Sequence, residues 1–531
     1  MIEENRLAEV LGALSLAADV AYGLELEQTM RTCVLGVELG RRHDLSNEAL
    51  RDVYYAILMA SLGSTAFAHE ASIYGHGDDI GTSRAIANMI SDPRPGKLPR
   101  FLSQIASGAP LLQRTRAIAR FALDDVANKH GHAVCDVAVH LARLIGASSG
   151  VRAALSQICE SWDGKGAPNG TAGEALQLPI RIEHISFFTE VAHRRDGRQA
   201  ALSLLKKQAG RHFDPALVKT FLAYAPELFA AVEVESIWER YLAAEPTPHA
   251  CAGEMRIDDV AQAFAELADV KSVWTLGHST GVAALAVRAA LALSLPDDES
   301  RILGRAALLH DLGRVGVPNR IWDKPAALNV SEREAVRMHA YWTERVLAQS
   351  PLLRDAAQCA WMAHERLDGT GYHRSVSRSM LGLPARLLAA ADAFHAMREP
   401  RPYRPARTLA EAAEALLEDV AAGPLDRQAA QAVLDVAGAT GSRADIAWPH
   451  GLTDREVDVL RLLARGQTNK QIASRLGISP RTAQHHVIHI YQKIEVSSRA
   501  AAALFATENG LLLPDGDTPD SRRRQRRSGE S

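Results

Sequence analysis

Hydrophobic residues along this chain gather in alanine- and leucine-rich runs, such as Leu7 to Val20 and Ile257 to Val270. Few stretches alternate β-branched and polar residues, which is the pattern typical of strands. Runs of this kind indicate helices. We therefore expect an almost wholly helical, all-α protein.

Two proline-containing breaks interrupt the helical pattern, at residues 244–248 and 447–451. Proline and glycine at such positions end helices and mark linkers. From Pro514 the chain is polar, charged and rich in turn-forming residues, which is typical of disorder. We predict three domains, at 1–243, 250–440 and 450–513, followed by a disordered Arg-rich tail at 514–531.

The first two predicted domains have related sequences. Segments match at an offset of 250 near the start of each copy and of 205 further on. The matched segments are 7–20 with 257–270, 58–63 with 308–313, and 160–166 with 365–371. The change of offset implies about 45 extra residues in the first copy, around Gly75 to Arg120. We interpret the two domains as a divergent tandem repeat.

The composition gives few constraints on the function of the protein. A chain of 531 residues with a net charge of −3 has no overall basic character, so a nucleic-acid site would have to be local. Its five cysteines show no CxxC spacing, which suits reduced thiols. No secretory signal and no apolar run of about 18 residues occur. We expect a cytoplasmic protein with no membrane partner.

The second copy carries six polar residues that the first copy lacks. They are His278, His310, Asp311, His339, His364 and Asp392. The first copy has Gln28, Ala60, Ser61, Cys159 and Phe187 in place of His278, His310, Asp311, His364 and Asp392 respectively. A single histidine beside an apolar stretch is more often a core or surface residue than a ligand. The first copy keeps the scaffold pattern but lacks these residues together. This favours a chemical role for them in the second copy over a role in packing.

Four imidazoles and two carboxylates form a mixed nitrogen and oxygen donor set. Such a set suits Fe or Mn, with Zn possible, better than a structural zinc site of thiolates. A carboxylate shared by two ions supports activation of water for attack on phosphorus. Arg314 follows this cluster closely and can hold a phosphate by two hydrogen bonds. We predict a divalent-metal site in which Asp311 and Arg314 serve catalysis.

Four short helices are predicted near the C-terminus, at 454–464, 469–476, 480–494 and 498–508. Thr453 and Glu456 form a capping-box pattern before the first helix. Ser479 and Pro480 follow Gly477 as a helix N-cap and first helical residue. Two short helices joined by a tight turn indicate a helix-turn-helix that binds the DNA major groove. The alternative is a small helical docking domain.

The second copy resembles the HD-GYP branch of the HD phosphohydrolase superfamily over residues 257 to about 440. The matching stretches are HSTGVA from His278, HDLGRVGVPNRIWDKPAAL from His310, His339 after an acidic helix, HERLDGTGY from His364, and ADAF with RPYRPA up to Ala406. The resemblance implies an all-helical fold, two or three iron or manganese ions and hydrolysis of cyclic di-GMP. It makes the six polar residues metal ligands.

The same resemblance assigns further residues and exposes departures. Arg314 replaces the lysine with which the family contacts phosphate, and Gly369, Gly371 and Tyr372 form the loop that names the family and binds substrate. Ala363 replaces one histidine of the family's usual pair, Trp274 stands where three-metal members have Glu, and His373 replaces proline. These departures imply at most two ions.

Residues 452–506 resemble the LuxR-type (GerE) helix-turn-helix. In that family the third helix reads bases, residues at the positions of Thr482 and Lys493 hold phosphates, and the last helix forms a dimer. The resemblance implies that double-stranded promoter DNA and a second copy of this chain are partners. The implied DNA-binding residues are Asn469, Lys470, Ser479, Arg481, Thr482, Gln484, His485, His486, Ile488 and Lys493.

Three hypotheses on function follow. The first is a transcription regulator whose second domain binds metal and senses or hydrolyses a cyclic dinucleotide. The second is a bifunctional phosphodiesterase with hydrolysis of cyclic di-GMP as its main activity. The third makes both repeated domains interaction modules.

Overall fold

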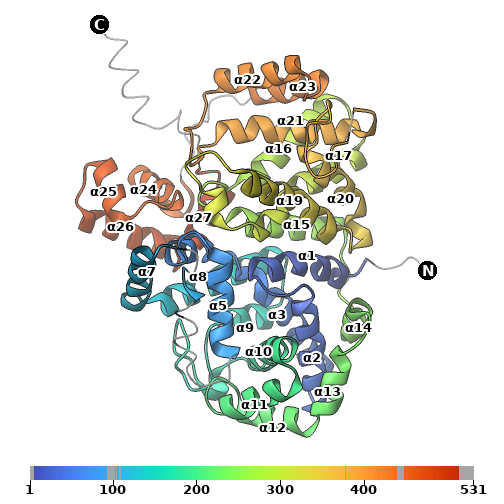
Figure 1. Cartoon of the computed structure of the whole chain (residues 1–531), viewed down its shortest axis with the longest axis vertical. Coiled ribbons are helices and arrows are strands. Elements are labelled where there is room, and N and C mark those ends of the chain that lie inside the picture. The colour runs from blue at the N-terminus through green and yellow to red at the C-terminus, as the bar shows by residue number, and fades with distance from the viewer. Residues whose placement is uncertain are drawn as a thin grey trace. The chain divides into compact units, whose positions relative to one another are not determined.

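The computed structural model describes residues 5–91, 102, 104–106, 109–376, 378–438 and 448–512. Every regular element in these ranges is a helix, and only isolated β-bridges occur among them. The all-α prediction is confirmed (Figure 1). Contacts divide the chain into two compact units, one mainly up to Ala263 and the other mainly from Phe264 onward.

The first unit is built around α2 and α10, which pack against each other and against α3. Its α-helices are α1 (Leu7–Ala21), α2 (Gln28–Arg42), α3 (Asn47–Ala60), α4 (Ala68–Tyr74), α5 (Asp79–Ser91), α7 (Leu111–Leu123), α8 (Val126–Leu144), α9 (Ser149–Leu155), α10 (Leu178–Asp196), α11 (Arg198–Gln208), α12 (Pro215–Ala223), α13 (Ala225–Val232) and α14 (Ile237–Ala244). The short helix η1 (Ser61–Gly63) follows α3.

In the second unit α16 packs against α17, α21 and α23. The helices between Glu254 and the C-terminal domain are α15 (Glu254–Asp269), α16 (His278–Ala292), α17 (Asp297–Leu309), η3 (Leu312–Gly316), α18 (Asn319–Trp322), α19 (Val330–Leu347), α20 (Arg354–Ala360), η5 (Trp361–His364), α21 (Leu383–Arg398), α22 (Leu409–Ala422) and α23 (Arg427–Gly438), together with short 3-10 turns. The division between the units runs through α15, and the first half of α18 belongs to the first unit.

The start of α2 and the start of α16 are held in the same way. Buried Asp19 accepts hydrogen bonds from the backbone N–H and the hydroxyl of Thr29. Asp269 accepts the same two bonds from Ser279, 250 residues later in both partners. The repeat predicted from sequence therefore recurs as a repeated hydrogen-bonding arrangement.

A second repeated arrangement closes the loop after α9 and after η5. Glu160 accepts from the backbone N–H groups of Asn169 and Thr171, at 2.7 and 3.1 Å. Glu365 accepts from those of Arg374 and Val376, at 2.8 and 3.1 Å. Every partner is shifted by 205 positions, so both copies fold this loop around one carboxylate.

The extra residues of the first copy lie between these two arrangements. A Cβ at Gly63 would meet the carbonyl of Val134, and one at Gly313 would meet that of His339. These paired close approaches place the change of offset between residues 63 and 134. Helices α4, α5 and α7 occupy that stretch where the second copy has only the four-residue α18. Part of the stretch lies outside the described residues.

The C-terminal helices are α24 (Asp454–Ala464), α25 (Asn469–Leu476), α26 (Pro480–Lys493) and α27 (Arg499–Glu508). Thr453 and Glu456 form the expected capping box, and the Ser479 hydroxyl caps α26. The four helices share a core that includes Val457, Leu460, Ile472 and Ile490. The predicted tail at 514–531 lies outside the described residues.

Among the described residues, no individual helix combines the length and apolar character needed to cross a membrane. One bent pair, formed by α12 and α13, meets the criterion by length and composition alone.

Candidate metal centre and DNA-binding helix

The six predicted metal-binding residues come from six different places in the second copy. His278 begins α16, His310 directly follows α17, and Asp311 precedes η3. His339 lies in α19, His364 ends η5, and Asp392 lies in α21. All six are buried. The fold brings together every member of the set that the sequence singled out.

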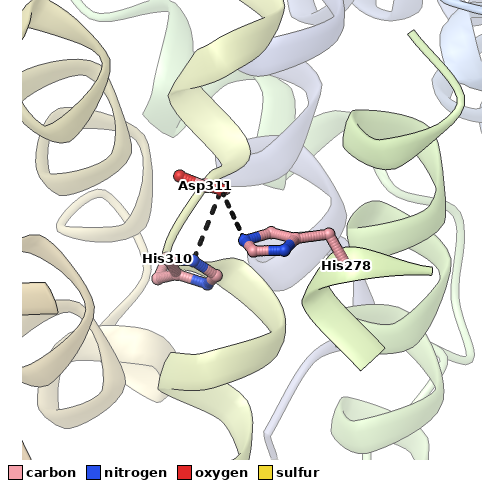
Figure 2. Close-up of side chains that lie close together, drawn as sticks. All are labelled: His278, His310 and Asp311. Carbon is pink, nitrogen blue, oxygen red and sulfur yellow. Dashed lines mark ion pairs between the residues drawn. The ribbon is translucent and has the colours of Figure 1, made fainter. Parts of the chain in front are cut away.

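One half of the cluster surrounds a single oxygen of Asp311 (Figure 2). The Nε2 atoms of His278 and His310 each lie 3.4 Å from Asp311 Oδ2. The same two nitrogens lie 3.2 and 3.8 Å from Oδ1 of Asp392. Two imidazoles and two carboxylate oxygens thus converge at what we call the His278 pole.

The other half surrounds the second oxygen of Asp311. His339 Nε2 lies 3.1 Å and His364 Nε2 3.3 Å from Asp311 Oδ1. His364 Nδ1 also lies 3.4 Å from Asp392 Oδ2. We call this group the His339 pole. Asp311 therefore faces two different pairs of histidines with its two oxygens.

The separations fit ligands of metal ions. Atoms that bind one ion at about 2.1 Å and at right angles are about 3.0 Å apart. The Nε2 atoms of His278, His310 and His339 are buried without a hydrogen-bond partner. Buried polar atoms that lack partners are costly unless a cation or water satisfies them. The residues therefore fit a metal site.

The hydrogen bonds of the Nδ1 atoms show which nitrogen of each ring can bind a metal ion. His310 Nδ1 donates to the carbonyl of Ala307 at 2.7 Å, and His339 Nδ1 donates to that of Val336 at 2.5 Å. Because a carbonyl can only accept, Nδ1 carries the proton and Nε2 keeps its lone pair. Partners of this kind fix the tautomer and orientation of metal-binding histidines.

Charges around the site favour cation binding. Burial would raise the pKa of Asp311, but Arg314 and the neighbouring histidines hold it well below its usual range. Burial lowers the pKa of His339 to about 4, so this ring is neutral at pH 7. Burial also acts to lower the pKa of His278, yet Glu399, Asp311 and Asp392 raise it well above its usual value. A metal ion at the His278 pole would displace that proton.

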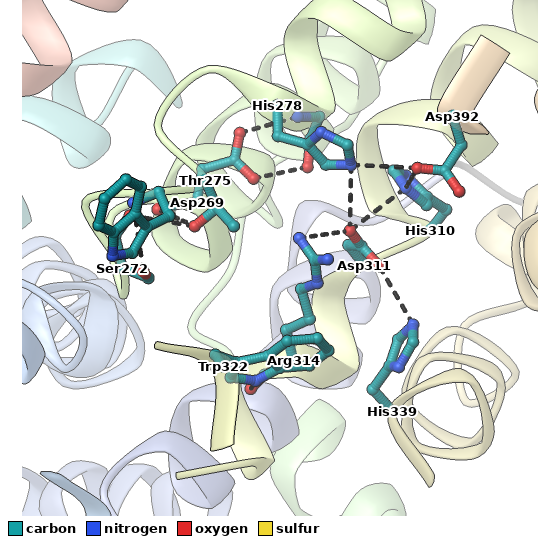
Figure 3. A network of polar contacts seen from close by, with 12 residues as sticks. Asp269, Ser272, Thr275, His278, His310, Asp311, Arg314, Trp322, His339 and Asp392 are labelled. Carbon is teal, nitrogen blue, oxygen red and sulfur yellow. Dashed lines mark hydrogen bonds and ion pairs between the residues drawn. The ribbon is translucent and has the colours of Figure 1, made fainter. Parts of the chain in front are cut away.

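Arg314 lies against the shared carboxylate, as Figure 3 shows. Its Nη1 is 2.8 Å from Asp311 Oδ2, and its guanidinium stacks on Trp322, 4.5 Å from the ring centroid. Trp322 Nε1 donates to the Arg314 carbonyl at 3.3 Å. The buried Nε of Arg314 has no hydrogen-bond partner. Arg314 therefore keeps a free donor beside the candidate metal centre.

The loop at residues 369–373 packs against the histidines. Tyr372 stacks on His364 with ring centroids 5.1 Å apart and planes 9° apart. Gly371 allows close approach to the backbone of Glu365, where a Cβ would collide. His373, which stands in place of the family's proline, pairs with Glu344 at 2.8 Å.

Sequence reasoning missed Glu399 and Asp269. Glu399 lies 2.8 Å from Nδ1 of His278, although 121 residues separate the two in sequence. Its position shortly after Asp392, within the matching C-terminal stretch, was an available signal. Asp269, which holds the start of α16, was detectable from its counterpart Asp19 in the first copy.

The first copy keeps the scaffold without the donors. Cys159, the counterpart of His364, has its Sγ 3.7 Å from Nδ1 of His130. Gln28, the counterpart of His278, donates to the hydroxyl of Thr32. Ala60 and Phe187 offer no metal-binding atom at the positions of His310 and Asp392.

The predicted DNA-binding residues lie mostly on one exposed face. Arg481, Thr482, Gln484, His485 and Ile488 of α26 are exposed, as are Lys470 and Ser479. Asn469 and His486 are half-buried. Ile488 is 45% exposed, which is unusual for a large apolar residue and suits contact with a base or its methyl group.

Lys493 is engaged within the domain itself. Its Nζ lies 2.7 Å from Glu456 and donates to the carbonyl of Gly451 at 2.9 Å. This residue therefore ties the end of α26 to the start of α24, and its predicted phosphate contact remains a prediction.

Two protein-family models match the chain. The HD domain matches residues 262–428, and the luxR family of bacterial regulatory proteins matches residues 450–506. The first range includes all six candidate ligands, and the second includes the four C-terminal helices up to most of α27.

Relatives of known activity match both parts. The chain is 29% identical over 425 residues to 3′3′-cGAMP-specific phosphodiesterase 3 of Vibrio cholerae, covering 78% of this chain and 90% of the relative. It is 37% identical over 149 residues to a cyclic di-GMP phosphodiesterase of Pseudomonas aeruginosa, covering 27% of this chain and 35% of the relative. It is also 39% identical over 106 residues to the DNA-binding transcriptional activator DevR/DosR of Mycobacterium tuberculosis, covering 19% and 48%.

A solved structure matches most of the fold. The crystal structure of a cyclic GMP-AMP-specific phosphodiesterase of V. cholerae aligns with a TM-score of 0.56 and 25% identity. The alignment covers 82% of this chain and 99% of that one. The two resemblances expected from the sequence are confirmed. The chain joins an HD domain to a C-terminal domain of the luxR family of bacterial regulatory proteins, and the relatives that match its HD domain include cyclic-dinucleotide phosphodiesterases.

Proposed function

We propose that the HD domain binds two divalent metal ions and a cyclic dinucleotide, and that its occupancy controls DNA binding by the luxR-family domain. One observation carries the proposal: the two oxygens of Asp311 face two different pairs of histidine nitrogens. A carboxylate in that position can be shared by two ions.

The six ligands of the proposal are His278, His310, Asp311, His339, His364 and Asp392. Their nitrogen and oxygen donors suit Fe or Mn, and three imidazoles with buried, unpartnered Nε2 atoms support that assignment. When bound, two such ions supply Lewis acidity and activated water for attack on a phosphodiester.

The ligand class rests on the relatives and on the residues beside the metal site. Relatives matching this domain act on 3′3′-cGAMP or cyclic di-GMP, so the ligand we propose is a cyclic dinucleotide. Arg314 offers a charged donor for a phosphate next to Asp311. Gly371 and Tyr372 contact the substrate from the neighbouring loop in this proposal.

In this proposal, helices α26 and α27 link binding of the nucleotide in the HD domain to binding of DNA. The exposed face of α26 contacts promoter DNA, and α27 pairs two copies of the chain in a dimer. A ligand that binds one state of the HD domain more tightly shifts the population of DNA-binding-competent protein.

Hydrolysis as the main activity is the second candidate. The complete set of six candidate ligands favours it, because a domain used only for protein contacts has no need of such a cluster. The two candidates differ in whether the bound nucleotide is consumed.

The test combines metal analysis with two assays. Anaerobically purified wild-type protein and Asp311→Ala are analysed for Fe and Mn by mass spectrometry. Both are then assayed with cyclic di-GMP and 3′3′-cGAMP in added Mn²⁺ or Fe²⁺, and for DNA binding. We expect about two ions in the wild type and a strong loss in the mutant.

The outcomes separate the hypotheses. Turnover that is lost in Asp311→Ala identifies an enzyme, whereas nucleotide binding without turnover identifies a sensor. No metal in either protein contradicts the proposal and leaves both repeated domains as interaction modules.

A further inference from the structure

Three histidines of the metal cluster direct Nε2 inward, but they are not all anchored in the same way. His310 and His339 donate from Nδ1 to carbonyls three residues earlier, those of Ala307 and Val336. Their orientation comes with the helical backbone on which they stand. It needs no distant side chain.

His278 has no such backbone acceptor. It is the first residue of α16, and the carbonyl three residues earlier, that of Thr275, accepts from the backbone N–H of His278. Its Nδ1 instead contacts Oε2 of Glu399 at 2.8 Å. Glu399 lies just after α21 and is mostly buried, with 15% of its side chain exposed.

Glu399 is itself held in place from two sides. Arg401 Nη2 lies 2.7 Å from Glu399 Oε2, and Arg401 Nη1 donates to the carbonyl of Trp274 at 3.0 Å. His395 Nε2 lies 3.4 Å from Glu399 Oε1. The carboxylate is therefore fixed to the segment that leads into α16.

A carboxylate acceptor differs from a carbonyl in charge. It makes the imidazole a stronger donor to a metal ion and adds negative charge behind it. Each pole includes one oxygen of Asp392, Oδ1 beside His278 and Oδ2 beside His364. The charge of Glu399 behind His278 is therefore what makes the two poles electrostatically unequal.

We infer that Glu399 is a positioning residue that makes the His278 pole the tighter of the two metal-binding positions. The inference rests on the proposed two-ion site. It predicts that the ions bind in order, first at the His278 pole and then at the His339 pole.

The experiment titrates metal-free, full-length protein with Mn²⁺. Calorimetry measures the affinity of each class of ion, and metal analysis counts the ions bound. The wild type is compared with Glu399→Gln, which keeps the size of the side chain and removes its charge. Glu344→Gln is the matched control, because Glu344 also pairs with a histidine and an arginine, His373 and Arg374. Thermal unfolding of each metal-free protein checks that the variants fold.

We expect two classes of ion in the wild type and in Glu344→Gln. In Glu399→Gln the tighter class weakens by about 10- to 100-fold while the weaker class is retained. Arg401→Gln, which removes the cation that holds Glu399, weakens the same class by a smaller factor. Nitrogen NMR of the histidines gives an independent readout, since the Nδ1 signal of His278 shifts in Glu399→Gln and stays unchanged in Glu344→Gln.

Two results overturn the inference alone. One is unchanged affinity of both classes in Glu399→Gln. The other is a third ion that is bound by the wild type and lost in that variant, which would make Glu399 a ligand together with His395. Absence of bound ions in the wild type would overturn the two-ion proposal itself and the inference with it.

Discussion

Arg314 shows how one side chain can serve both the resting site and a bound ligand. It pairs with Asp311 and stacks on Trp322, yet its Nε remains without a hydrogen-bond partner. A planar guanidinium held in this way is already oriented for a phosphate, and lysine would not reproduce the stacking.

We predict that Arg314→Ala retains its metal ions but binds or turns over a cyclic dinucleotide about 10- to 100-fold less well, a loss of roughly 1.4–2.7 kcal/mol. Arg314→Lys recovers only part of this because it restores charge without the planar fork. Metal analysis and nucleotide titration of both variants measure the effect. Equal nucleotide affinity in wild type and Arg314→Ala would remove Arg314 from the binding site.

At the scale of residues, the sequence predicted the six candidate ligands but not Glu399, which orients His278. The six candidate ligands were recognisable because five of them have counterparts without an imidazole or a carboxylate in the same chain, and the fold brings all six together. Glu399 was not recognisable in this way. Its contact with His278 joins residues 121 positions apart, and its place in the matching stretch after Asp392 does not indicate which residue it contacts.

At the scale of elements, the short helices η1 and η3 give a prediction in which one copy is the control for the other. Gly313 sits where η3 meets the backbone of α19, and Gly63 occupies the equivalent place in the first copy. Any side chain at either glycine meets a main-chain carbonyl oxygen, which cannot rotate away.

We predict that Gly313→Ala and Gly63→Ala each destabilise the protein by about 1–3 kcal/mol. Only Gly313→Ala lowers metal content, because the carbonyl it displaces belongs to His339. Chemical unfolding and metal analysis of the two variants test this. Equal metal content in both would show that the position of α19 does not control the site.

The second prediction concerns Glu183 in α10, which is buried in the first copy. Burial raises its pKa from 4.5 to about 8, so the folded state binds this proton more tightly than the unfolded state. The stabilising contribution is fully present below pH 4.5 and is lost as the pH rises through about 8.

We therefore predict that Glu183→Gln is more stable than the wild type above pH 8, by an amount on the order of a few kcal/mol, and loses stability less steeply between pH 5 and 8. Urea unfolding across this range measures the difference. Parallel curves for the two proteins would mean that Glu183 titrates as it does in the unfolded chain.

Helix boundaries were predictable wherever caps mark them. Thr453 with Glu456 and Ser479 with Pro480 start α24 and α26 at the expected residues. The ends were less certain, since α26 stops at Lys493 instead of residue 494 and α27 begins at Arg499 instead of Ser498. The sequence located the insertion of the first copy but not its helices α4, α5 and α7, because nothing in the second copy corresponds to them.

At the scale of the whole molecule, the HD and luxR-family domains are joined in one chain, and in the proposed function DNA binding responds to the candidate metal site. We predict that removing metal with a chelator changes affinity for promoter DNA by a factor of about 5 to 150, the usual range for coupled sites. Fluorescence anisotropy with labelled DNA measures the change. Asp311→Ala should mimic the chelator and no longer respond to it.

The DNA-binding face itself can be tested apart from the metal. Gln484→Ala removes an exposed side chain of α26 that can pair with adenine, at an expected cost of about 1–3 kcal/mol in specific binding. Metal content should not change. If binding to specific and random DNA fell equally, Gln484 would not be reading a base.

The organisation of the whole chain was the most predictable level. Offsets of 250 and 205 between similar segments indicated a repeated helical domain, and equivalent hydrogen bonds occur at both offsets. The domain boundaries at 243, 250, 440 and 450 remain predictions.

The two loops closed by Glu160 and Glu365 show that the residues that shape the fold are separate from those of the candidate metal site. The first copy has the carboxylate that folds its loop, although Ala60, Cys159 and Phe187 stand where the second copy has His310, His364 and Asp392. Protein engineering could use this separation by introducing histidines and aspartates at the equivalent positions of the first copy, which has the same backbone arrangement around its loop.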